Sequence, residues 1–233
     1  MVKAKTVYVC SNCGADSPKW IGKCPSCGEW NTYVEEIVVK EPVGKRALYD
    51  VSDGGKVRPV LLRDITSEEE TRVDLGDREL NRVLGGGLVK GSLVLIGGEP
   101  GIGKSTLVLQ TVLGSSDVCS SDLTVLGLKG LRTLYVSGEE SSRQLKLRAD
   151  RIAHENPDCF ILCETNLEQI FVQTKNVQPD LLIIDSIQTI YTEVVESSPG
   201  SVSQVRECSA AILKYAKESG TPVLLIGHIN KEG

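Results

Sequence analysis

A glycine-rich segment, GEPGIGKS at residues 98–105, has the residue types and the spacing of a phosphate-binding loop. It fits the pattern G-x-x-x-x-G-K-[ST] at every fixed position. Glycines let backbone N–H groups curl around phosphate, and the start of a following helix adds positive potential. Lys104 is predicted to reach the β and γ phosphates of ATP, Ser105 to bind Mg²⁺, and Thr106 to contact the α phosphate. The predicted ATP-binding residues are Gly98, Glu99, Pro100, Gly101, Ile102, Gly103, Lys104, Ser105 and Thr106.

Further polar residues follow apolar segments in the second half of the chain. The run LLII at residues 181–184 is typical of a buried strand, and Asp185 at its end is predicted to hold Mg²⁺ through water. Glu139 and Glu140 follow another apolar segment, where either carboxylate could activate water at the same sheet edge. They could also stabilise a helix N-terminus. His228 follows a further strand, where it could sense phosphate or be structural.

Four cysteines near the N-terminus form two C-x-x-C pairs, Cys10 with Cys13 and Cys24 with Cys27, separated by ten residues. Two such turns supply the four sulfur ligands of a tetrahedral structural zinc site. A unit this small cannot bury enough apolar surface to fold alone, so we expect the metal to hold it together. The alternative is a redox pair or unpaired thiols.

Lysine and tryptophan side chains lie between and beside these cysteine pairs. Lys19, Trp20, Lys23 and Trp30 could contact nucleic acid through charge and stacking. They could equally contact a protein, and either tryptophan could instead cap the small core. The sequence leaves these alternatives open.

Apolar and amphipathic segments alternate from residue 76 onward. Strands are expected at 93–96, 134–136, 160–163, 181–184 and 223–226, and helices at 105–113, 141–153, 167–174 and 202–219. This alternation predicts an α/β fold with a mostly parallel sheet and helices on both faces. The predicted organisation is a zinc-binding module at 1–36, a linker at 37–75 and the α/β core at 76–233.

The segment at residues 114–123, GSSDVCSSDL, interrupts this pattern. Its Ser, Asp and Gly are poor helix formers, so the preceding helix is expected to end near residue 113. Two interpretations stay open, a surface loop or an artefact of cloning or sequence assembly.

Composition narrows the class of protein. The net charge of −5 argues against a protein that coats nucleic acid through overall positive charge, although a local basic patch could still bind phosphates. No apolar run approaches the roughly 20 residues that a membrane span requires. The chain opens without the pattern of a signal peptide, and we expect a cytoplasmic protein without membrane association.

In this order, the motifs resemble the bacterial RadA (Sms) family of DNA repair proteins. The matching segments are CSNCGADSPKWIGKCPSCGEWNT, RVLGGGLVKGSLVLIGGEPGIGKSTLVLQ, LYVSGEESSRQLKLRADRI, LLIIDSIQT, PGSVSQVRECSAAILKYAK and GHINKEG. The resemblance implies a RecA-like ATPase that uses ATP, Mg²⁺ and Zn²⁺. It also implies movement on single-stranded DNA that promotes branch migration of recombination intermediates, a hexameric ring and a recombinase partner. It favours Glu139 over Glu140 as the water-activating carboxylate. The predicted catalytic residues are therefore Lys104, Glu139 and Asp185.

Three departures from the family pattern limit what the resemblance implies. Asn230 occupies the position of a threonine, residues 114–122 do not match, and the chain ends at Gly233. The family continues beyond this point with a Lys-Asn-Arg-Phe-Gly motif and a domain resembling Lon protease. We therefore expect a fragment that binds ATP better than it hydrolyses it. The alternative functions are a nucleotide-dependent switch of RecA fold without motor activity, or a partial product without activity.

Overall fold

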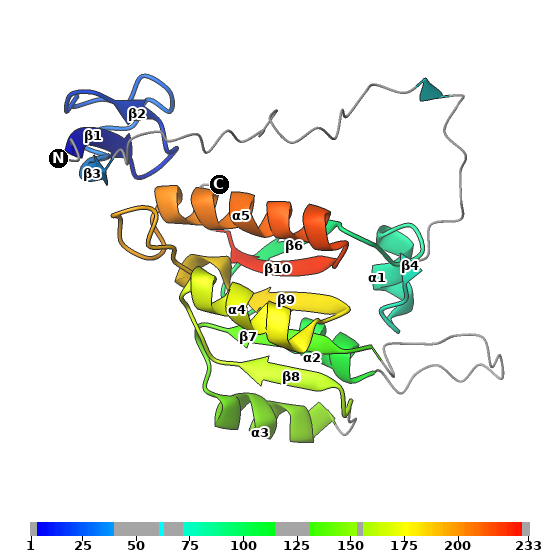
Figure 1. Ribbon diagram of the computed structural model, residues 1–233. Helices are drawn as coiled ribbons and strands as arrows, with labels where there is room; N and C mark the ends of the chain where they lie inside the picture. Colours follow the sequence, from blue (N-terminus) through cyan, green and yellow to red (C-terminus); the bar gives the residue numbers. More distant parts are fainter. Residues whose placement is uncertain (1–3, 40–60, 63–71, 115–130, 153–155, 230–233) are drawn as a thin grey trace. The chain divides into compact units, whose positions relative to one another are not determined.

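The computed structural model describes residues 4–39, 61–62, 72–114, 131–152 and 156–229 (Figure 1). Two compact units are present, one with strands β1 to β3 and the other with strands β4 to β10 and helices α1 to α5. Residues 115–123 of the unusual segment, and Asn230, lie outside the described residues. Within the described part, each helix is too short or too polar to span a bilayer.

The N-terminal unit is a small antiparallel sheet with the order β2-β1-β3. Its strands are β1 (Ala4–Cys10), β2 (Asp16–Ser17) and β3 (Tyr33–Val39). β3 continues past the predicted module end at residue 36, because it pairs with β1 as far as the Ala4–Val39 pair. The buried hydrophobic cluster of its described part consists of Cys10, Cys24 and Tyr33. Trp20 and Trp30 are 54 % and 66 % exposed, so neither tryptophan caps this core.

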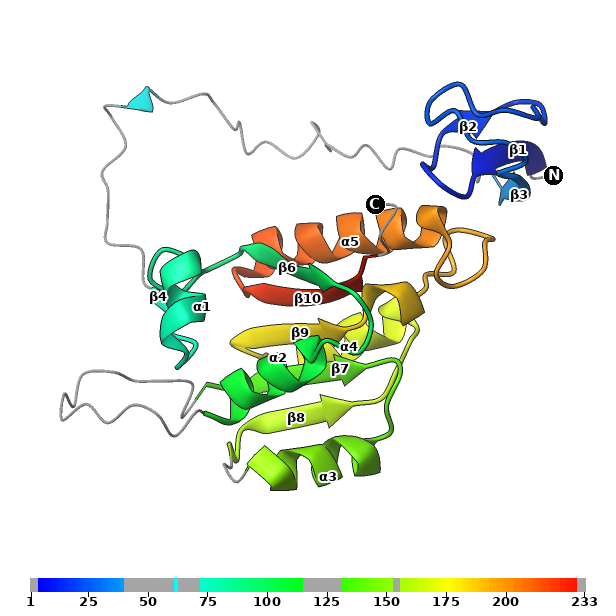
Figure 2. The same ribbon diagram turned by 180° about the vertical axis from the view of Figure 1, so that it is seen from behind.

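The second unit is built on a five-stranded sheet with the order β6-β10-β9-β7-β8, in which all neighbours are parallel. Its strands are β6 (Leu93–Gly98), β7 (Thr133–Ser137), β8 (Cys159–Leu162), β9 (Leu181–Asp185) and β10 (Val223–His228). The main helices are α2 (Lys104–Leu113), α3 (Ser142–Ile152), α4 (Leu167–Val177) and α5 (Val202–Ser219). Helices α4 and α5 cover one face (Figure 1), and α2 and α3 cover the other (Figure 2). This arrangement confirms the predicted fold class.

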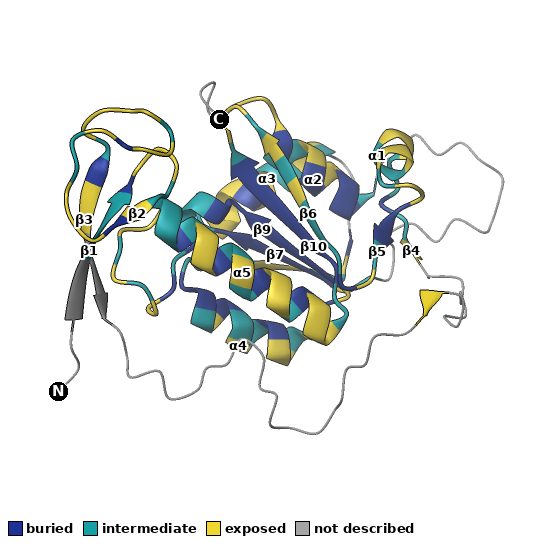
Figure 3. Cartoon of the chain, turned by 90° about the horizontal axis from the view of Figure 1, so that it is seen from above, coloured by how far each residue is buried: buried dark blue, intermediate teal, exposed yellow. Residues whose placement is uncertain are grey.

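The core lies in two layers, one on each face of the sheet. Along β9, Leu181 and Ile183 pack with residues of α2 and α3, whereas Leu182 and Ile184 pack with residues of α4 and α5. Strands covered on both faces are apolar at every position, which explains the uninterrupted LLII run. Figure 3 shows these central strands as buried.

A smaller element precedes the sheet. β4 (Arg72–Val73) pairs antiparallel with β5 (Leu88–Val89), and the short helix α1 (Arg78–Val83) lies between them in the chain. Leu75 is fully buried against residues of the α2 side of the core. The second unit therefore begins ahead of the predicted boundary at residue 76.

Two glycines set the limits of α2. Gly103 has φ 93° and directly precedes the helix, and Gly114 has φ 91° and directly follows it. Such left-handed conformations favour glycine. The helix ends at Leu113, as the sequence predicts.

Candidate functional site

The strand register brings the predicted site residues to one edge of the parallel sheet. Ile96, Ile226, Asp185 and Ser137 form one row across β6, β10, β9 and β7. One or two residues beyond this row, at the carboxyl ends of the strands, come Gly98, His228, Ser186 and Glu139. Ligands of open α/β sheets bind at this edge.

The glycine loop connects β6 to α2, as the motif requires. Gly101 and Gly103 have positive φ values of 80° and 93°, which let the backbone turn sharply into the helix. Lys104 begins α2 and is only 7 % exposed. Its Nζ donates to the carbonyl oxygens of Gly98 at 2.7 Å and Glu99 at 2.8 Å. The ammonium group is thus held within the curve of its own loop.

A chain of polar contacts runs from Lys104 to Glu139. Lys104 Nζ lies 3.3 Å from His228 Nδ1, and His228 Nε2 lies 3.1 Å from Glu139 Oε1. The same Glu139 oxygen accepts a 2.6 Å hydrogen bond from the Ser186 hydroxyl. This hydrogen bond is the largest cause that holds the pKa of Glu139 below its usual value, and burial opposes it. His228 therefore joins the loop lysine to a carboxylate that stays ionised.

Asp185 lies at the end of β9 and is 5 % exposed. The hydroxyl of Tyr135, in the neighbouring strand β7, donates to Asp185 Oδ2 at 2.6 Å. Burial, and then the charge of Asp185, raise the pKa of Tyr135 well above its usual value, so this hydroxyl stays protonated and donates. The carboxylate of Asp185 and the hydroxyl of Ser105 are hard oxygen donors of the kind that Mg²⁺ prefers, so the donor set fits this ion.

The two candidate glutamates have different surroundings. Glu139 faces Ser186 and His228, whereas the Glu140 side chain forms an ion pair with Arg148 of α3. The backbone N–H of Glu140 also donates to Ser137 Oγ at 3.0 Å. Only Glu139 of this pair belongs to the chain of contacts that reaches Lys104.

Three residues of this edge were missed by the sequence analysis. The Ser186 hydroxyl donates a hydrogen bond to Glu139, and the Tyr135 hydroxyl donates one to Asp185. Gly138 lets the backbone pass close to Thr189. A Cβ atom at Gly138 would lie 2.0 Å from Thr189 Oγ1. Ser186 adjoins Asp185 in the sequence and could have been considered, but only the pairing of β7 with β9 brings Tyr135 to the site.

The four N-terminal cysteines gather as the spacing predicts. Their sulfur atoms all lie within 4.8 Å of one another, with Cys10 and Cys27 at 3.7 Å and Cys13 and Cys24 at 3.5 Å. A tetrahedral site with metal–sulfur bonds of about 2.3 Å has sulfur atoms about 3.8 Å apart, so the cluster fits such a metal. A hydrogen bond from the Cys27 backbone, with a further one from Tyr33, lowers the pKa of Cys24 to about 6.

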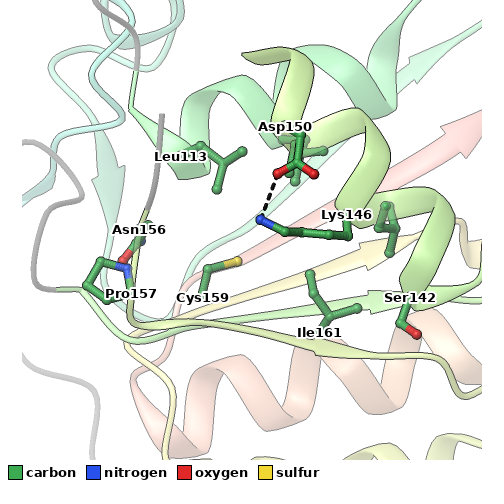
Figure 4. Close-up of a pocket in the computed structure, with 11 residues that line it drawn as sticks. Leu113, Ser142, Lys146, Asp150, Asn156, Pro157, Cys159 and Ile161 are labelled. Carbon is green, nitrogen blue, oxygen red and sulfur yellow. Dashed lines mark ion pairs between the residues drawn. The ribbon is translucent and has the colours of Figure 1, made fainter. Parts of the chain in front are cut away.

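A pocket of about 480 Å³ lies elsewhere, between α2, α3 and β8 (Figure 4). Leu109 and Leu113 of α2 and Cys159 at the start of β8 line it. Lys146 and Asp150 of α3 form a 2.7 Å ion pair beside it. None of the predicted site residues lines this pocket, because the glycine loop is at the opposite end of α2.

Two family models match the chain. The AAA domain matches residues 58–233, which include the glycine loop and the carboxyl edge of the sheet. The rubredoxin metal binding domain matches residues 8–35, which include all four clustered cysteines.

Curated relatives match all of this chain. DNA repair protein RadA of Bacillus subtilis (strain 168) is 49 % identical over 233 residues, and RadA of Listeria monocytogenes is 47 % identical over 237. RadA of Pseudomonas aeruginosa is 45 % identical over 234 residues. The chain spans 48 % of the length of each relative. Among solved structures, a KaiC-like protein of Pyrococcus horikoshii OT3 has the same fold, with a TM-score of 0.52 and 20 % identity over 69 % of this chain and 71 % of that one.

Proposed function

The chain belongs to the AAA-domain family, and on this premise we propose that it is a DNA-dependent ATPase of DNA repair, similar in activity to the RadA proteins. One observation carries the proposal. The loop lysine Lys104 and the carboxylate of Glu139 are linked through His228 at the carboxyl edge of the sheet. A phosphate-binding group and a candidate base thus lie together at the carboxyl edge of the sheet, one on each side of His228.

In the proposed reaction, Lys104 leaves the loop carbonyls and binds the β and γ phosphates of ATP. Glu139 orients a water molecule and accepts its proton while the water oxygen attacks the γ phosphorus. The bond from the γ phosphorus to the oxygen bridging to the β phosphate breaks, and ADP and phosphate leave. The depressed pKa of Glu139 keeps the carboxylate ionised and able to accept the proton near neutral pH.

We assign the remaining site residues by the same argument. The loop residues 98–106 are the proposed ATP contacts, and Ser105 and Asp185 would hold Mg²⁺. When bound, Mg²⁺ neutralises charge on the phosphates. Tyr135 fixes Asp185 Oδ2 and so orients this carboxylate. Because the fourfold thiolate cluster is closed, its proposed ion is a structural zinc rather than a catalytic one.

The wider biological role follows from the relatives named RadA. We propose single-stranded DNA and recombination intermediates as substrates, branch migration as the outcome, and a recombinase as a partner. We also propose a cytoplasmic protein whose whole-length form assembles as a hexameric ring. The relatives named RadA are about twice the length of this chain.

The test is ATP turnover by the chain with and without single-stranded DNA, beside a Lys104→Ala variant. Turnover that DNA raises and that the substitution abolishes supports the proposal. Nucleotide binding without turnover would instead support a switch, in which ATP removes Lys104 from His228 and changes the contacts of Glu139. Failure to bind nucleotide at all would contradict both functions.

A further inference from the structure

The N-terminal unit carries two exposed tryptophans beside two lysines. We propose that this surface, formed by Lys19, Trp20, Gly22, Lys23 and Trp30 and here named the indole platform, binds single-stranded DNA by stacking on its bases. The inference rests on the proposed function only in taking single-stranded DNA as the partner. It concerns a surface that the ATPase mechanism does not use.

The backbone of the indole platform is a short hydrogen-bonded ribbon next to the cysteine cluster. Lys23 and Trp30 face each other as an antiparallel bridge. On either side of this pair, Asn31 N–H donates to the Gly22 carbonyl oxygen at 2.8 Å, and Cys24 N–H donates to that of Glu29 at 2.8 Å. Because Cys24 belongs to the thiolate cluster, a bound metal fixes the ribbon that presents the tryptophans.

Both indole rings converge on Gly22. A Cβ atom at this glycine would lie 3.7 Å from Trp20 Cη2 and 3.8 Å from Trp30 Cζ3. Trp20 and Trp30 are 54 % and 66 % exposed and lie outside the buried cluster of their unit. Two neighbouring, largely exposed tryptophans are what stacking of successive bases requires.

The charges near the rings favour a nucleic acid over an uncharged apolar partner. The segment SPKWIGKC, residues 17–24, contains two lysines and no acidic residue. Lys23 Nζ lies 5.5 Å from the centroid of the Trp30 ring, and Lys19 adjoins Trp20. Glu29, next to Trp30, is the acidic residue of the facing segment. Lysines can bind phosphates while the indoles bind bases, and a duplex, whose bases are already stacked, offers no free base face.

The composition of the chain gives a direct assay. Its two tryptophans are Trp20 and Trp30, so intrinsic tryptophan fluorescence reports on the indole platform alone. Titration of the metal-loaded chain with oligothymidylate, without nucleotide, is expected to quench this emission. Anisotropy of a labelled oligothymidylate then measures the affinity of variants. Trp20→Ala and Trp30→Ala are each expected to weaken binding by about 5- to 100-fold, whereas Trp20→Phe keeps most of it.

Matched controls separate stacking from general damage. Val34→Ala changes a residue on β3 that is 55 % exposed, nearly the same as Trp20, and should leave the affinity unchanged. Lys23→Gln should reduce the slope of log affinity against log salt by about 0.7. The metal content of each variant checks that its unit is folded.

Two outcomes would overturn the inference. If the tryptophan-to-alanine variants keep their metal and bind the oligonucleotide like the parent, the indole platform does not bind DNA; DNA-stimulated turnover could still occur, and the proposed function would stand. If the parent chain binds no oligonucleotide, both the platform and the DNA dependence of the ATPase are wrong.

Discussion

The hydrogen bond between Tyr135 and Asp185 gives a prediction with a calculable size. Tyr135 is fully buried, Asp185 is 5 % exposed, and their oxygens are 2.6 Å apart. A hydrogen bond to a charged group contributes about 1.5–3 kcal/mol. Tyr135→Phe removes the hydroxyl but keeps the ring, so this range is the expected loss in free energy of unfolding. For a unit of this size the melting temperature should fall by about 3–12 °C.

Urea unfolding followed by circular dichroism measures this loss as a lower midpoint with an unchanged slope. Tyr215→Phe is the matched control, because the Tyr215 ring stacks on Phe171 with centroids 5.4 Å apart and this contact survives the change. The control should shift stability by less than about 0.5 kcal/mol. Tyr135→Phe should also raise the Mg²⁺ concentration needed for half-maximal turnover. A loss no larger than that of the control would refute the reasoning.

Three further predictions concern the site edge and the metal centre. In Gly138→Ala the added methyl group would lie 2.0 Å from Thr189 Oγ1, so the free energy of unfolding should fall by about 1–3 kcal/mol. Thermal unfolding measures this loss, and an unchanged melting temperature would contradict the close approach. Ser186→Ala removes the main cause of the low Glu139 pKa, an effect that stabilises the fold above the ordinary carboxyl pKa and is lost as the pH falls through the lower folded value. Because the Glu139 side chain is 44 % exposed, the expected loss in free energy of unfolding is only about 0.5–1 kcal/mol at pH 7. In a series of urea titrations this loss should shrink as the pH falls below the ordinary carboxyl pKa of 4.5; a loss that stays constant below that pKa would count against it. Removal of metal by a chelator should abolish the ordered NMR signals of β1 to β3 and leave those of β6 to β10, whereas unchanged N-terminal signals would show that metal is not needed there.

The sequence predicted the centre of the parallel sheet well because its strands β7, β9 and β10 are buried on both faces. The run at 181–184 lies within β9, which continues to Asp185, and the helix before the GSSDVCSSDL segment ends at Leu113 as expected. Such strands are apolar at every position and are bounded by glycine or polar residues, so their first and last residues can be recognised from the sequence alone. The cysteine cluster was predicted for a similar reason, since its ligands are close in the chain.

Contacts across the sheet could not be predicted in this way. Ser186, which follows β9, and His228, at the end of β10, contact Glu139, and Tyr135 reaches Asp185 only because β7 and β9 are neighbours. Their positions depend on strand order and register, which the spacing of residues along the chain does not specify. The extension of β3 to Val39 likewise depends on its partner strand rather than on its own composition.

The central claim is that Glu139, rather than Glu140, serves as the base of an ATPase. Its most direct test is ATP turnover by the Glu139→Gln and Glu140→Gln variants, with nucleotide binding measured in parallel. We predict that Glu139→Gln lowers turnover by about 10²- to 10⁴-fold while ATP binding persists. Glu140→Gln, which removes only the pairing with Arg148, should keep most of the activity. Equal turnover in the two variants, or a larger loss for Glu140→Gln, would contradict the account.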